Sequence, residues 1–396
     1  MRLSGHDIVC LSAIDWDHPV PAQAHALMGQ LAEMNRVLWV DAPATPWRAL
    51  RHVGEPRYQE KWAAWAGLRR GPRRLAQNLY VWTPPPGTPF MRLDAWRLRR
   101  ALAEVLTELR FDAPIYWADA QRPGVPEVLA GVDACLVVSQ LYGTDRVVSP
   151  PSRRALAMAD LALVSTVSQR RELADAVPNA QCLPRGIEFD RFNRAVYSDT
   201  PLAADLAAHG RPIVAYVGEV GEAFDFKLWE WLAQKRPTWL FVAIGALRPG
   251  YQERAQRAMR QPNVQFLGPR PAEAIPSYLK AVSAVAFPLK RLDPAPEAAE
   301  VYECFAAGKP VVTTDLTLAE DLAARVSGKH EFLKALDDHV TQPSARGVFE
   351  RIQRAQGHSW EARARRLEAI LLDQLALKVK PSAIPLLVER IVRQRV

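Results

Sequence analysis

Short apolar runs alternate with longer segments of helical periodicity along most of the chain. In the first half, the runs that predict strands are Ile8–Ala13, Arg36–Val40, Leu79–Trp82, Ala113–Trp117, Ala134–Val138 and Leu161–Val164. In the second half, they are Ile213–Val217, Leu240–Ile244, Val264–Phe266, Ala284–Phe287 and Pro310–Thr313. Continuously apolar strands separated by helices are typical of parallel sheets that are covered on both faces. The pattern therefore predicts an α/β fold.

The alternation of strands and helices restarts after Arg194, where a polar segment leads into the strand Ile213–Val217. We therefore expect one parallel-sheet domain over residues 1–196, a second over 197–375, and a helical tail over 376–396. Sheets of this kind bind ligands beyond the carboxyl ends of their strands. We expect the two domains to face each other across an interdomain cleft.

The charge of the chain is concentrated in one segment. Hydrophobic residues make up 49% of the 396 residues and charged residues 24%, which excludes a disordered or fibrous protein. The formal net charge is +8, yet residues 47–100 alone contain 12 basic and 3 acidic residues. This segment therefore accounts for the whole excess, which favours one local basic face over a general affinity for nucleic acids.

Cysteine usage and apolar run lengths indicate a cytoplasmic protein. No CxxC pair occurs among Cys10, Cys135, Cys182 and Cys304. Neither a disulfide framework nor a zinc site is therefore predicted, and no histidine pair has metal-ligand spacing. Asp15 and Asp17 interrupt the first apolar run too early for a secretory signal peptide. No stretch approaches the 18 apolar residues that predict a spanning helix.

The segment Pro288–Thr313 carries the clearest chemical signal, because it is typical of a strand, a loop, a helix and a second strand. The helix is predicted from about Pro296 to Ala307. A helix that follows a strand in this way presents free backbone amides, which bind phosphates. Lys290 and Arg291 add positive charge just before it, and Glu303 could hold ribose hydroxyls. An ordinary strand-helix-strand unit with solvated charges is the open alternative.

Part of this segment, YECFAAGKPVVTTD, resembles the donor site of group 1 (family 4) glycosyltransferases, which have the GT-B fold. Further segments resemble the same family in the same chain order: CLPRGIEFDRF, RPIVAYVGEVGEAFDFKLWEWLAQKRPTWLFVAIGA, VQFLGPRPAEAIPSYLKAVSAVAFPLKR and SWEARARRLEAIL. In the first of these, Arg185 stands where the family has Asn. The resemblance covers about residues 180–375. Within the family, the chain resembles bacterial enzymes of surface polysaccharide assembly, of the teichuronic-acid type. The resemblance implies two Rossmann-like domains, an acceptor-binding one over 1–196 and a nucleotide-sugar-binding one over 197–375.

The resemblance also implies roles for single residues of the second domain. Glu303 would hold the ribose, and Gly218 would begin the loop under the donor phosphates. Phe266, Leu267 and Gly268 would present backbone groups to the base, with Arg270 near the base or phosphates. The other positions assigned to the donor site are Lys227, Lys290, Arg291, Glu297, Glu300 and Tyr302. No metal or other obligatory cofactor is implied, because the nucleotide sugar is a co-substrate. A strand-end turn at Gly218 and a solvated Arg270 are the alternatives.

The chain departs from the family at the start of the predicted helix. Most members have a second Glu eight residues before the one at Glu303, and here that position is Ala295. Related subgroups carry a Lys where this chain has Glu300 and an Asn where it has Glu297. Two carboxylates in a first helical turn would repel a pyrophosphate. The donor sugar and the retaining or inverting outcome therefore stay open.

Candidate catalytic residues in the first half follow predicted strands. Asp15, Asp17 and His18 follow the first strand, and Asp145 follows the strand Ala134–Val138. Side chains at the carboxyl ends of parallel strands face the binding crevice, so each is a candidate base for the acceptor hydroxyl. A loop or helix-capping role is the alternative for each.

The basic segment also contains a predicted aromatic helix face. Its apolar positions are Tyr58, Trp62, Trp65 and Leu68, with Arg57 and Lys61 beside them. Tryptophan with basic residues on such a helix suits an anionic bilayer surface. The alternative is that this face packs on the sheet. RNA binding is a lesser option, since no nucleic-acid motif accompanies the charge.

We therefore expect an enzyme, a glycosyltransferase of the hexosyltransferase type. It would move a sugar from a UDP- or GDP-sugar to a cell-surface glycan or lipid-linked acceptor, with no nucleic-acid partner. Contact of residues 47–100 with the inner face of a membrane would make it peripheral. Two alternatives stay open: a nucleotide-sugar epimerase or hydrolase on the same fold, and a non-catalytic sugar- or partner-binding scaffold.

Overall fold

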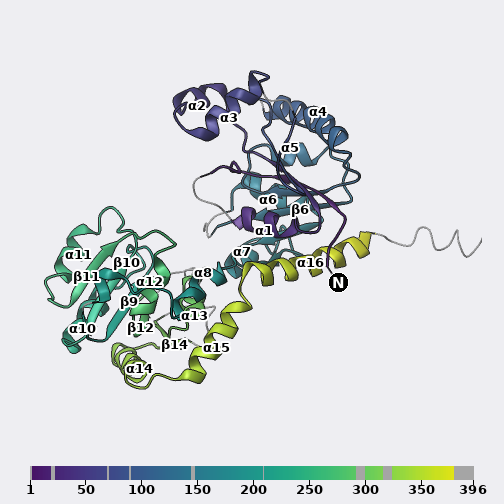
Figure 1. Ribbon diagram of the computed structural model, residues 1–396. Coiled ribbons are helices and arrows are strands. Elements are labelled where there is room, and N and C mark those ends of the chain that lie inside the picture. Colours follow the sequence, from purple (N-terminus) through teal and green to yellow (C-terminus); the bar gives the residue numbers. More distant parts are fainter. Residues whose placement is uncertain are drawn as a thin grey trace, which may run out of the picture. The chain divides into compact units, whose positions relative to one another are not determined.

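The chain forms two compact units, which Figure 1 shows in the colours of the sequence. The computed structural model describes residues 2–18, 23–68, 71–88, 91–143, 148–207, 209–290, 299–314 and 323–378. The first unit comprises Met1–Pro184 with Arg363–Val396, and the second comprises Arg185–Ala362. The division therefore lies at Arg185 and not after residue 196. The segment from Arg363 onwards belongs with the first unit, whereas we expected residues up to 375 to belong with the second.

The first unit contains an eight-stranded sheet. Its strands are β1 (Asp7–Leu11), β2 (Arg36–Val40), β3 (Arg73–Ala76), β4 (Leu79–Trp82), β5 (Ile115–Asp119), β6 (Leu136–Leu141), β7 (Leu161–Val164) and β8 (Gln181–Cys182). They lie in the order β3-β4-β2-β1-β5-β6-β7-β8. All neighbours are parallel except the edge pair β3 and β4. The strand order reverses at β1, so the crevice beyond β1 and β5 is where such a sheet binds ligands.

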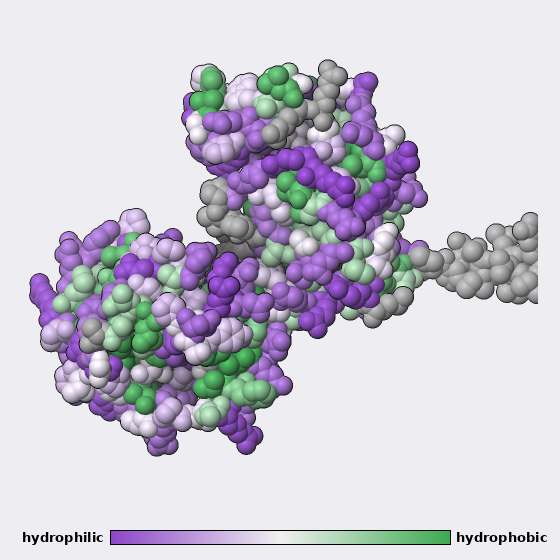
Figure 2. Space-filling view, in the orientation of Figure 1, coloured by the Kyte–Doolittle hydropathy of each residue, from purple (hydrophilic) through white to green (hydrophobic). Residues whose placement is uncertain are grey.

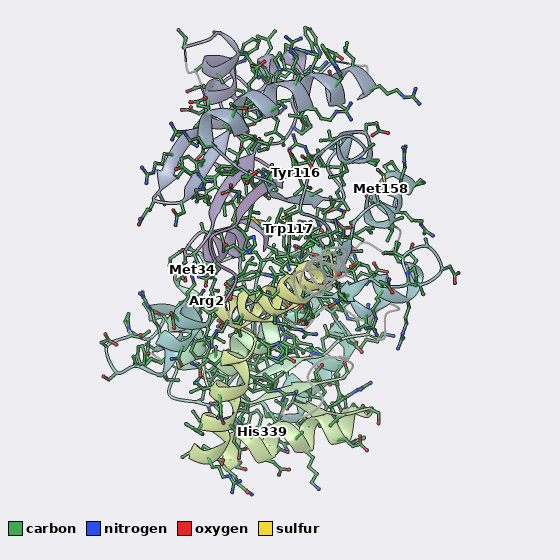
Figure 3. All side chains as sticks on the ribbon, turned by 90° about the vertical axis from the view of Figure 1, so that its right-hand side faces the viewer. Arg2, Met34, Tyr116, Trp117, Met158 and His339 are labelled. Atoms are coloured by element: carbon green, nitrogen blue, oxygen red, sulfur yellow. The ribbon has the colours of Figure 1, made fainter. Side chains whose placement is uncertain are left out.

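Helices cover both faces of this sheet. They are α1 (Gln23–Leu31), α2 (Pro46–Arg51), α3 (Pro56–Trp65), α4 (Met91–Leu109), α5 (Val125–Leu129), α6 (Pro150–Ala157), α7 (Val167–Glu172) and α16 (Trp360–Lys378). Apolar residues of α4, α5 and α6 share one core with β1, β2 and β5. On α1, His25 packs against the buried Trp39 of β2. Arg2 lies beside α16 and pairs with its Glu368 at 3.5 Å (Figure 3), which attaches this last helix to the first unit.

The second unit contains a six-stranded parallel sheet. Its strands are β9 (Ile213–Val217), β10 (Leu240–Ile244), β11 (Val264–Gly268), β12 (Ala284–Phe287), β13 (Val311–Thr313) and β14 (Ala324–Arg325). They lie in the order β11-β10-β9-β12-β13-β14, and every neighbouring pair is parallel. This is the strand order of the Rossmann fold, with its switch point between β9 and β12.

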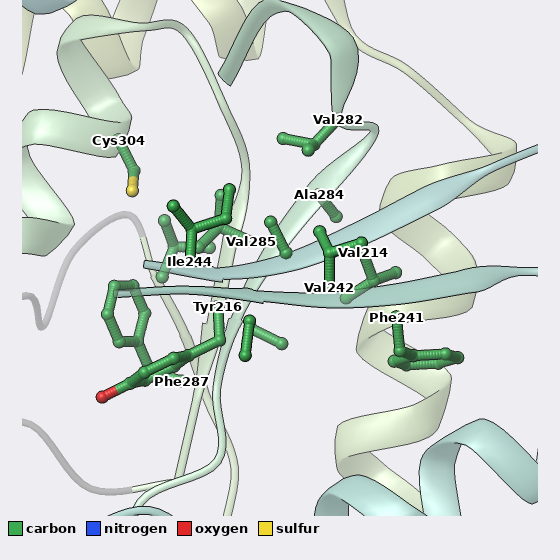
Figure 4. Packing of buried hydrophobic residues seen from close by; sticks show 14 of the residues in the cluster. Val214, Tyr216, Phe241, Val242, Ile244, Val282, Ala284, Val285, Phe287 and Cys304 are labelled. Carbon is green, nitrogen blue, oxygen red and sulfur yellow. The ribbon is translucent and has the colours of Figure 1, made fainter. Parts of the chain in front are cut away.

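The helical segments of the second unit are α8 (Phe189–Asn193), η1 (Arg194–Val196), α9 (Ala204–Ala207), α10 (Phe226–Lys235), α11 (Gln252–Ala258), α12 (Ile275–Ala281), α13 (Ala299–Ala306), α14 (Lys329–Thr341) and α15 (Ala345–Gln356). One apolar core joins them to the sheet. In it, the ring of Tyr216 on β9 meets that of Phe287 on β12 edge to face, with 5.6 Å between ring centroids (Figure 4). Cys304 points from α13 toward the strands in the same view. The core thus holds α13 against the switch-point strands.

The predicted α/β class with two parallel sheets is confirmed, and each predicted strand is present within a few residues of its expected bounds. The structure adds β3, β8 and β14, which are edge strands of two to four residues. Their sequences, RRLA, QC and AR, contain no apolar run that could have marked them as strands. The expected helix start at Pro296 lies outside the described residues, as do residues 379–396 of the expected tail. Within the described ranges, the longest helices lack the apolarity that crossing a bilayer requires.

Candidate functional site

Three glycines lie at the carboxyl ends of neighbouring strands in the second unit. Gly218, Gly245 and Gly268 follow or end β9, β10 and β11, and all have positive φ, at 149°, 150° and 73°. The Gly218 amide donates to the Ile244 carbonyl, and the Gly245 amide donates to the Gly268 carbonyl, each at 3.0 Å. A Cβ on Gly245 would lie 1.9 Å from the Gly218 carbonyl oxygen. The backbones of these strand ends are therefore closely packed, and we call the three residues the glycine floor. Gly245 was not predicted from the sequence as a site residue, although it closes an apolar run as the other two glycines do.

Glu303 lies on α13 of the same unit, and its carboxylate lies 3.8 Å from the Arg185 guanidinium. Burial and, to a smaller extent, the nearby Glu300 raise the pKa of Glu303 to about 7, while Arg185 opposes the shift. The carboxyl therefore exchanges its proton near neutral pH. No role was predicted for Arg185 from the sequence. The presence of Arg where the family has Asn was the one feature that could have drawn attention to this position.

Glu300 and Tyr302 share α13 with Glu303 but differ in their surroundings. Burial and the nearby Glu300 and Glu219 raise the pKa of the Tyr216 phenol, which donates to the Glu219 carbonyl at 2.8 Å. Glu300 therefore lies close to the loop that follows Gly218. Tyr302 is buried and stacks on His358 with 3.5 Å between ring centroids. Its ring thus takes part in packing within the unit.

A basic cavity of about 960 Å³ opens where β12, β13 and β14 end and where α10 and α14 begin. It brings together four cations, which are Lys227, Lys290, Arg325 and Lys329. Lys290 donates to the Glu222 carbonyl at 3.3 Å, and Lys329 stands 5.0 Å from the centroid of the Trp231 ring. Asp225 and Glu331 are the acidic residues of the lining. Its size and charge suit an anion as large as a diphosphate-bearing nucleotide.

The two helix ends at this basic cavity differ in how their amides are used. Asp225 accepts from the amides of Lys227 and Leu228 at the start of α10. At the start of α14, Gly328 is the N-cap residue and no side chain caps the helix. The amides of α14 are therefore the ones available to an anion. Arg325 and Lys329 were not predicted from the sequence as site residues, because they lie in a segment without a recognisable motif.

Three further residues assigned to the donor site do not line this cavity: Phe266, Leu267 and Arg270. The Phe266 ring stacks on Phe226 at 6.1 Å between centroids, and Leu267 packs against the same core. Arg270 donates to the Tyr278 hydroxyl at 2.6 Å and to Asp205 at 3.2 Å. Arg270 is thus engaged beside α9 and α12 and is not part of the cavity lining. The two further assigned positions, Arg291 and Glu297, lie outside the described residues.

In the first unit, Asp17 and His18 lie in neighbouring cavities beyond β1. Asp17 lines a cavity of about 320 Å³ and forms an ion pair with Arg73. His18 lines a cavity of about 190 Å³, and its backbone amide donates to the Asp15 carbonyl at 3.2 Å. The expected position of both residues at the carboxyl end of the sheet is therefore observed. Asp15, the candidate base between β1 and Asp17, is instead buried in an ion pair with Lys61. The candidate Asp145 lies outside the described residues.

Buried charges lie at and just beyond the carboxyl ends of β2 and β5, and they were not among the residues predicted from the sequence. Burial raises the pKa values of Asp41, which follows β2, and Asp119, which ends β5, to about 6 each. Burial lowers the pKa of Arg122 to about 10, and its guanidinium donates to the Val40 and Asp41 carbonyls at 3.0 and 2.8 Å. An Asp directly after a buried strand was the available signal for both carboxylates.

The aromatic face predicted for residues 58–68 packs against the first unit. Tyr58 is buried, and Trp62 and Trp65 are half-buried against Ala44 and Ala49. The Trp65 indole donates to the Pro84 carbonyl at 2.9 Å. Of the four predicted apolar positions, Leu68 is the one that is largely exposed. This face therefore packs on the protein, which was the alternative to its contact with a bilayer.

Metal ligands and disulfides do not shape either unit in the described part of the chain. No cluster of three or more His, Cys, Asp or Glu side chains that could hold a metal ion occurs there. The four cysteines are free, and two of them, Cys10 and Cys304, are buried. They pack as small apolar side chains.

Residues 208–342 match the protein family described as glycosyl transferases group 1. Over 134 residues the chain is 28% identical to TuaH of Bacillus subtilis (strain 168), which is named as a candidate teichuronic acid biosynthesis glycosyltransferase. The match covers 33% of this chain and 33% of that relative. The aligned segment thus spans about a third of the relative's length.

Solved structures resemble almost the whole chain at low sequence identity. Sucrose-phosphate synthase from Thermosynechococcus elongatus is 15% identical with a TM-score of 0.60, over 94% of this chain and 100% of that chain. HepE of Anabaena, in complex with UDP, is 14% identical with a TM-score of 0.59, over 93% and 100%. Likenesses at this level of identity establish the fold. The chain thus has the GT-B fold of two parallel-dominated sheets with helices, and its second unit carries the segment that matches the group 1 glycosyl transferases.

Proposed function

We propose that this protein transfers a sugar from a nucleotide-sugar donor, a UDP- or GDP-sugar, to a cell-surface glycan or a lipid-linked acceptor. The match of residues 208–342 to group 1 glycosyl transferases and the relative named for teichuronic acid biosynthesis support this reaction class. The observation that carries the proposal is the basic cavity with Lys227, Lys290, Arg325 and Lys329, which lies within the matched segment.

The donor's diphosphate would bind in the basic cavity. Lys227 and Lys290 reach it from one side, and Arg325 and Lys329 reach it from β14 and α14. As the bond between sugar and diphosphate breaks, negative charge grows on the departing phosphate oxygens. Cations already in place would stabilise that charge without reorganising, which lowers the barrier.

The nucleoside end of the donor would lie toward α13, where Glu303 would accept hydrogen bonds from the ribose hydroxyls. The backbone of Gly218 and Gly268 at the strand ends leaves room for close approach of a ligand. Glu300, close to this loop, carries negative charge that the four cations of the cavity would offset.

The first unit would supply the acceptor site and the base. A carboxylate or imidazole that takes the acceptor hydroxyl's proton must lie within hydrogen-bonding reach of it. Asp17, His18 and Asp145 are the candidates, and Asp41 joins them because it lines the same cavity as Asp17. We place the enzyme at the cytoplasmic side of the envelope, peripheral to the membrane, with no nucleic-acid partner.

Calorimetric titration with UDP and GDP tests the donor site. The variant Lys227→Ala/Lys290→Ala should weaken binding by roughly tenfold or more, because each charge-assisted contact contributes about 1.5–3 kcal/mol. The control Arg254→Ala removes an exposed cation on α11 and should leave binding unchanged. If the lysine variant and the wild type bind UDP and GDP with equal affinity, the assignment of the donor site to this cavity is wrong.

Product analysis then separates the reaction classes. With a panel of UDP- and GDP-hexoses and a lipid-linked or glycan acceptor, transfer should require the acceptor. Free nucleotide with an altered sugar in the absence of acceptor would identify an epimerase or hydrolase instead. Nucleotide binding without turnover under any of these conditions would identify a scaffold.

A further inference from the structure

Large apolar side chains that remain exposed gather in one part of the first unit. Sixteen such side chains are exposed among the described residues, and seven of these fall within residues 47–96: Trp47, Leu50, Val53, Leu68, Leu75, Leu93 and Trp96. The two tryptophans are 64% and 50% exposed. In Figure 2, apolar groups stand among hydrophilic ones over α2, at the upper end of the first unit. Exposed tryptophans are costly in water, so their concentration here indicates a contact surface.

Arginines accompany both tryptophans. The Arg51 guanidinium lies 5.3 Å from the Trp47 ring centroid, and the Arg100 guanidinium lies 5.8 Å from that of Trp96. Arg51 contacts no acidic side chain among the described residues. Arg100 has only a long contact of 3.9 Å with Glu104, and both of those side chains are largely exposed. The positive charge is therefore largely uncompensated locally.

The helices that carry these pairs are neighbours. Figure 1 places α2 and α4 at the same end of the first unit. They both line a cavity of about 230 Å³, which Arg48 reaches from α2 and Arg97 from α4. Five prolines form much of the rest of its wall, which are Pro43, Pro84, Pro85, Pro86 and Pro123. The cavity thus adds two further arginines between the helices.

We propose that the face formed by Trp47, Leu50, Arg51, Leu93, Trp96 and Arg100, here named the α2/α4 face, binds the surface of an anionic lipid bilayer. Tryptophan rings prefer the depth of the lipid headgroups, and arginines beside them meet the lipid phosphates. A protein partner would require acidic groups opposite the same arginines, whereas an anionic bilayer supplies both the apolar layer and the phosphates. The inference deepens the proposed function, since a lipid-linked acceptor would be met here, but binding itself needs no sugar transfer.

Co-sedimentation of the full chain with vesicles tests the α2/α4 face. Vesicles that contain phosphatidylglycerol should bind the protein at low salt, and vesicles of phosphatidylcholine alone should bind it far more weakly. Binding should fall as salt rises, because exposed charges are screened. Failure to bind the anionic vesicles at low salt would overturn the proposal.

Two double variants separate charge from insertion. Arg51→Ala/Arg100→Ala should lower the partition coefficient by about 30-fold. Trp47→Ala/Trp96→Ala should lower it by about tenfold, because a half-inserted ring withdraws only part of its apolar area from water. These side chains are exposed, so circular dichroism should show unchanged folding.

Matched controls lie on the second unit. Arg254→Ala removes a guanidinium that stands 5.2 Å from the Tyr251 ring centroid, and Phe349→Ala removes a ring that is 66% exposed. Both should bind vesicles like the wild type. If the α2/α4 variants also bind like the wild type, or if they instead abolish self-association of a protein that ignores vesicles, the proposal fails. Intact vesicle binding without any sugar transfer would contradict the proposed function and leave this inference standing.

Discussion

Lys61 on α3 donates a hydrogen bond to the carboxylate of Asp15, beyond β1, over 2.7 Å, and both side chains are almost withdrawn from water, at 2% and 8% exposure. Lys61 also donates to the Ala42 carbonyl at 2.9 Å, and Asp15 accepts from the Ala42 amide at 3.1 Å. The pair therefore ties α3 to the carboxyl ends of β1 and β2. One lysine of the basic segment is thus a structural residue and does not contribute to the surface charge.

Breaking this pair should be costly. Lys61→Met should lower the free energy of unfolding by about 3–5 kcal/mol, because it leaves the Asp15 carboxylate buried without its counter-charge. The double variant Asp15→Asn/Lys61→Met should recover most of that loss. Urea denaturation measures both, and Arg346→Ala is the control, since its ion pair with Glu350 is exposed and should change stability by less than about 1 kcal/mol. A double variant as unstable as the single one would contradict the argument.

Nucleotide-sugar binding should depend on pH through Glu303. Its pKa of about 7 means that the carboxylate form, which accepts from ribose hydroxyls, becomes dominant as the pH rises from 6 to 8. Affinity for a UDP- or GDP-hexose should therefore rise about tenfold over this range. Glu303→Gln should bind with nearly constant affinity. Identical pH profiles for the two proteins would show that Glu303 does not contact the donor.

The glycine floor of the second unit should not tolerate a side chain. Gly245→Ala should destabilise the protein by about 3 kcal/mol or more, because its Cβ would collide with the Gly218 carbonyl and φ is positive. Gly29→Ala, within α1, has nothing within 4 Å of the added carbon and should be neutral or stabilising by up to about 1 kcal/mol. Thermal unfolding compares the two variants. Similar melting temperatures would refute the close backbone approach.

Asp119 should make stability pH-dependent. Burial raises its folded pKa from 3.8 to about 6, so the folded chain keeps a proton that the unfolded chain releases. The contribution to stability is therefore present below pH 3.8 and is lost as the pH rises through 6, by up to about 3 kcal/mol. Asp119→Asn lacks this titration. Its unfolding free energy relative to the wild type should rise between pH 4 and pH 7, and a constant difference would exclude the buried carboxylate as the cause.

Several features could be predicted from local sequence alone. Apolar periodicity places the strands correctly, since the side chains of a buried parallel strand must be apolar at successive positions. The segments around Gly218 and Glu303 are similarly local, so their motif could be recognised. Lys227 and Lys290 were assigned beside the donor phosphates, and the structure places both in one basic cavity.

Other features depend on packing between segments that are far apart in the sequence. Nothing in the order of residues shows that Lys61 is buried against Asp15, or that Arg185 faces Glu303. The aromatic face around Trp62 has the same periodicity whether it packs on protein or on lipid, because periodicity defines an apolar face and not its neighbour. The sequence therefore determined the strands, the fold class and the donor motif. Only the tertiary structure decided which charges are buried and which aromatic side chains remain exposed, because desolvation depends on contacts across the whole fold.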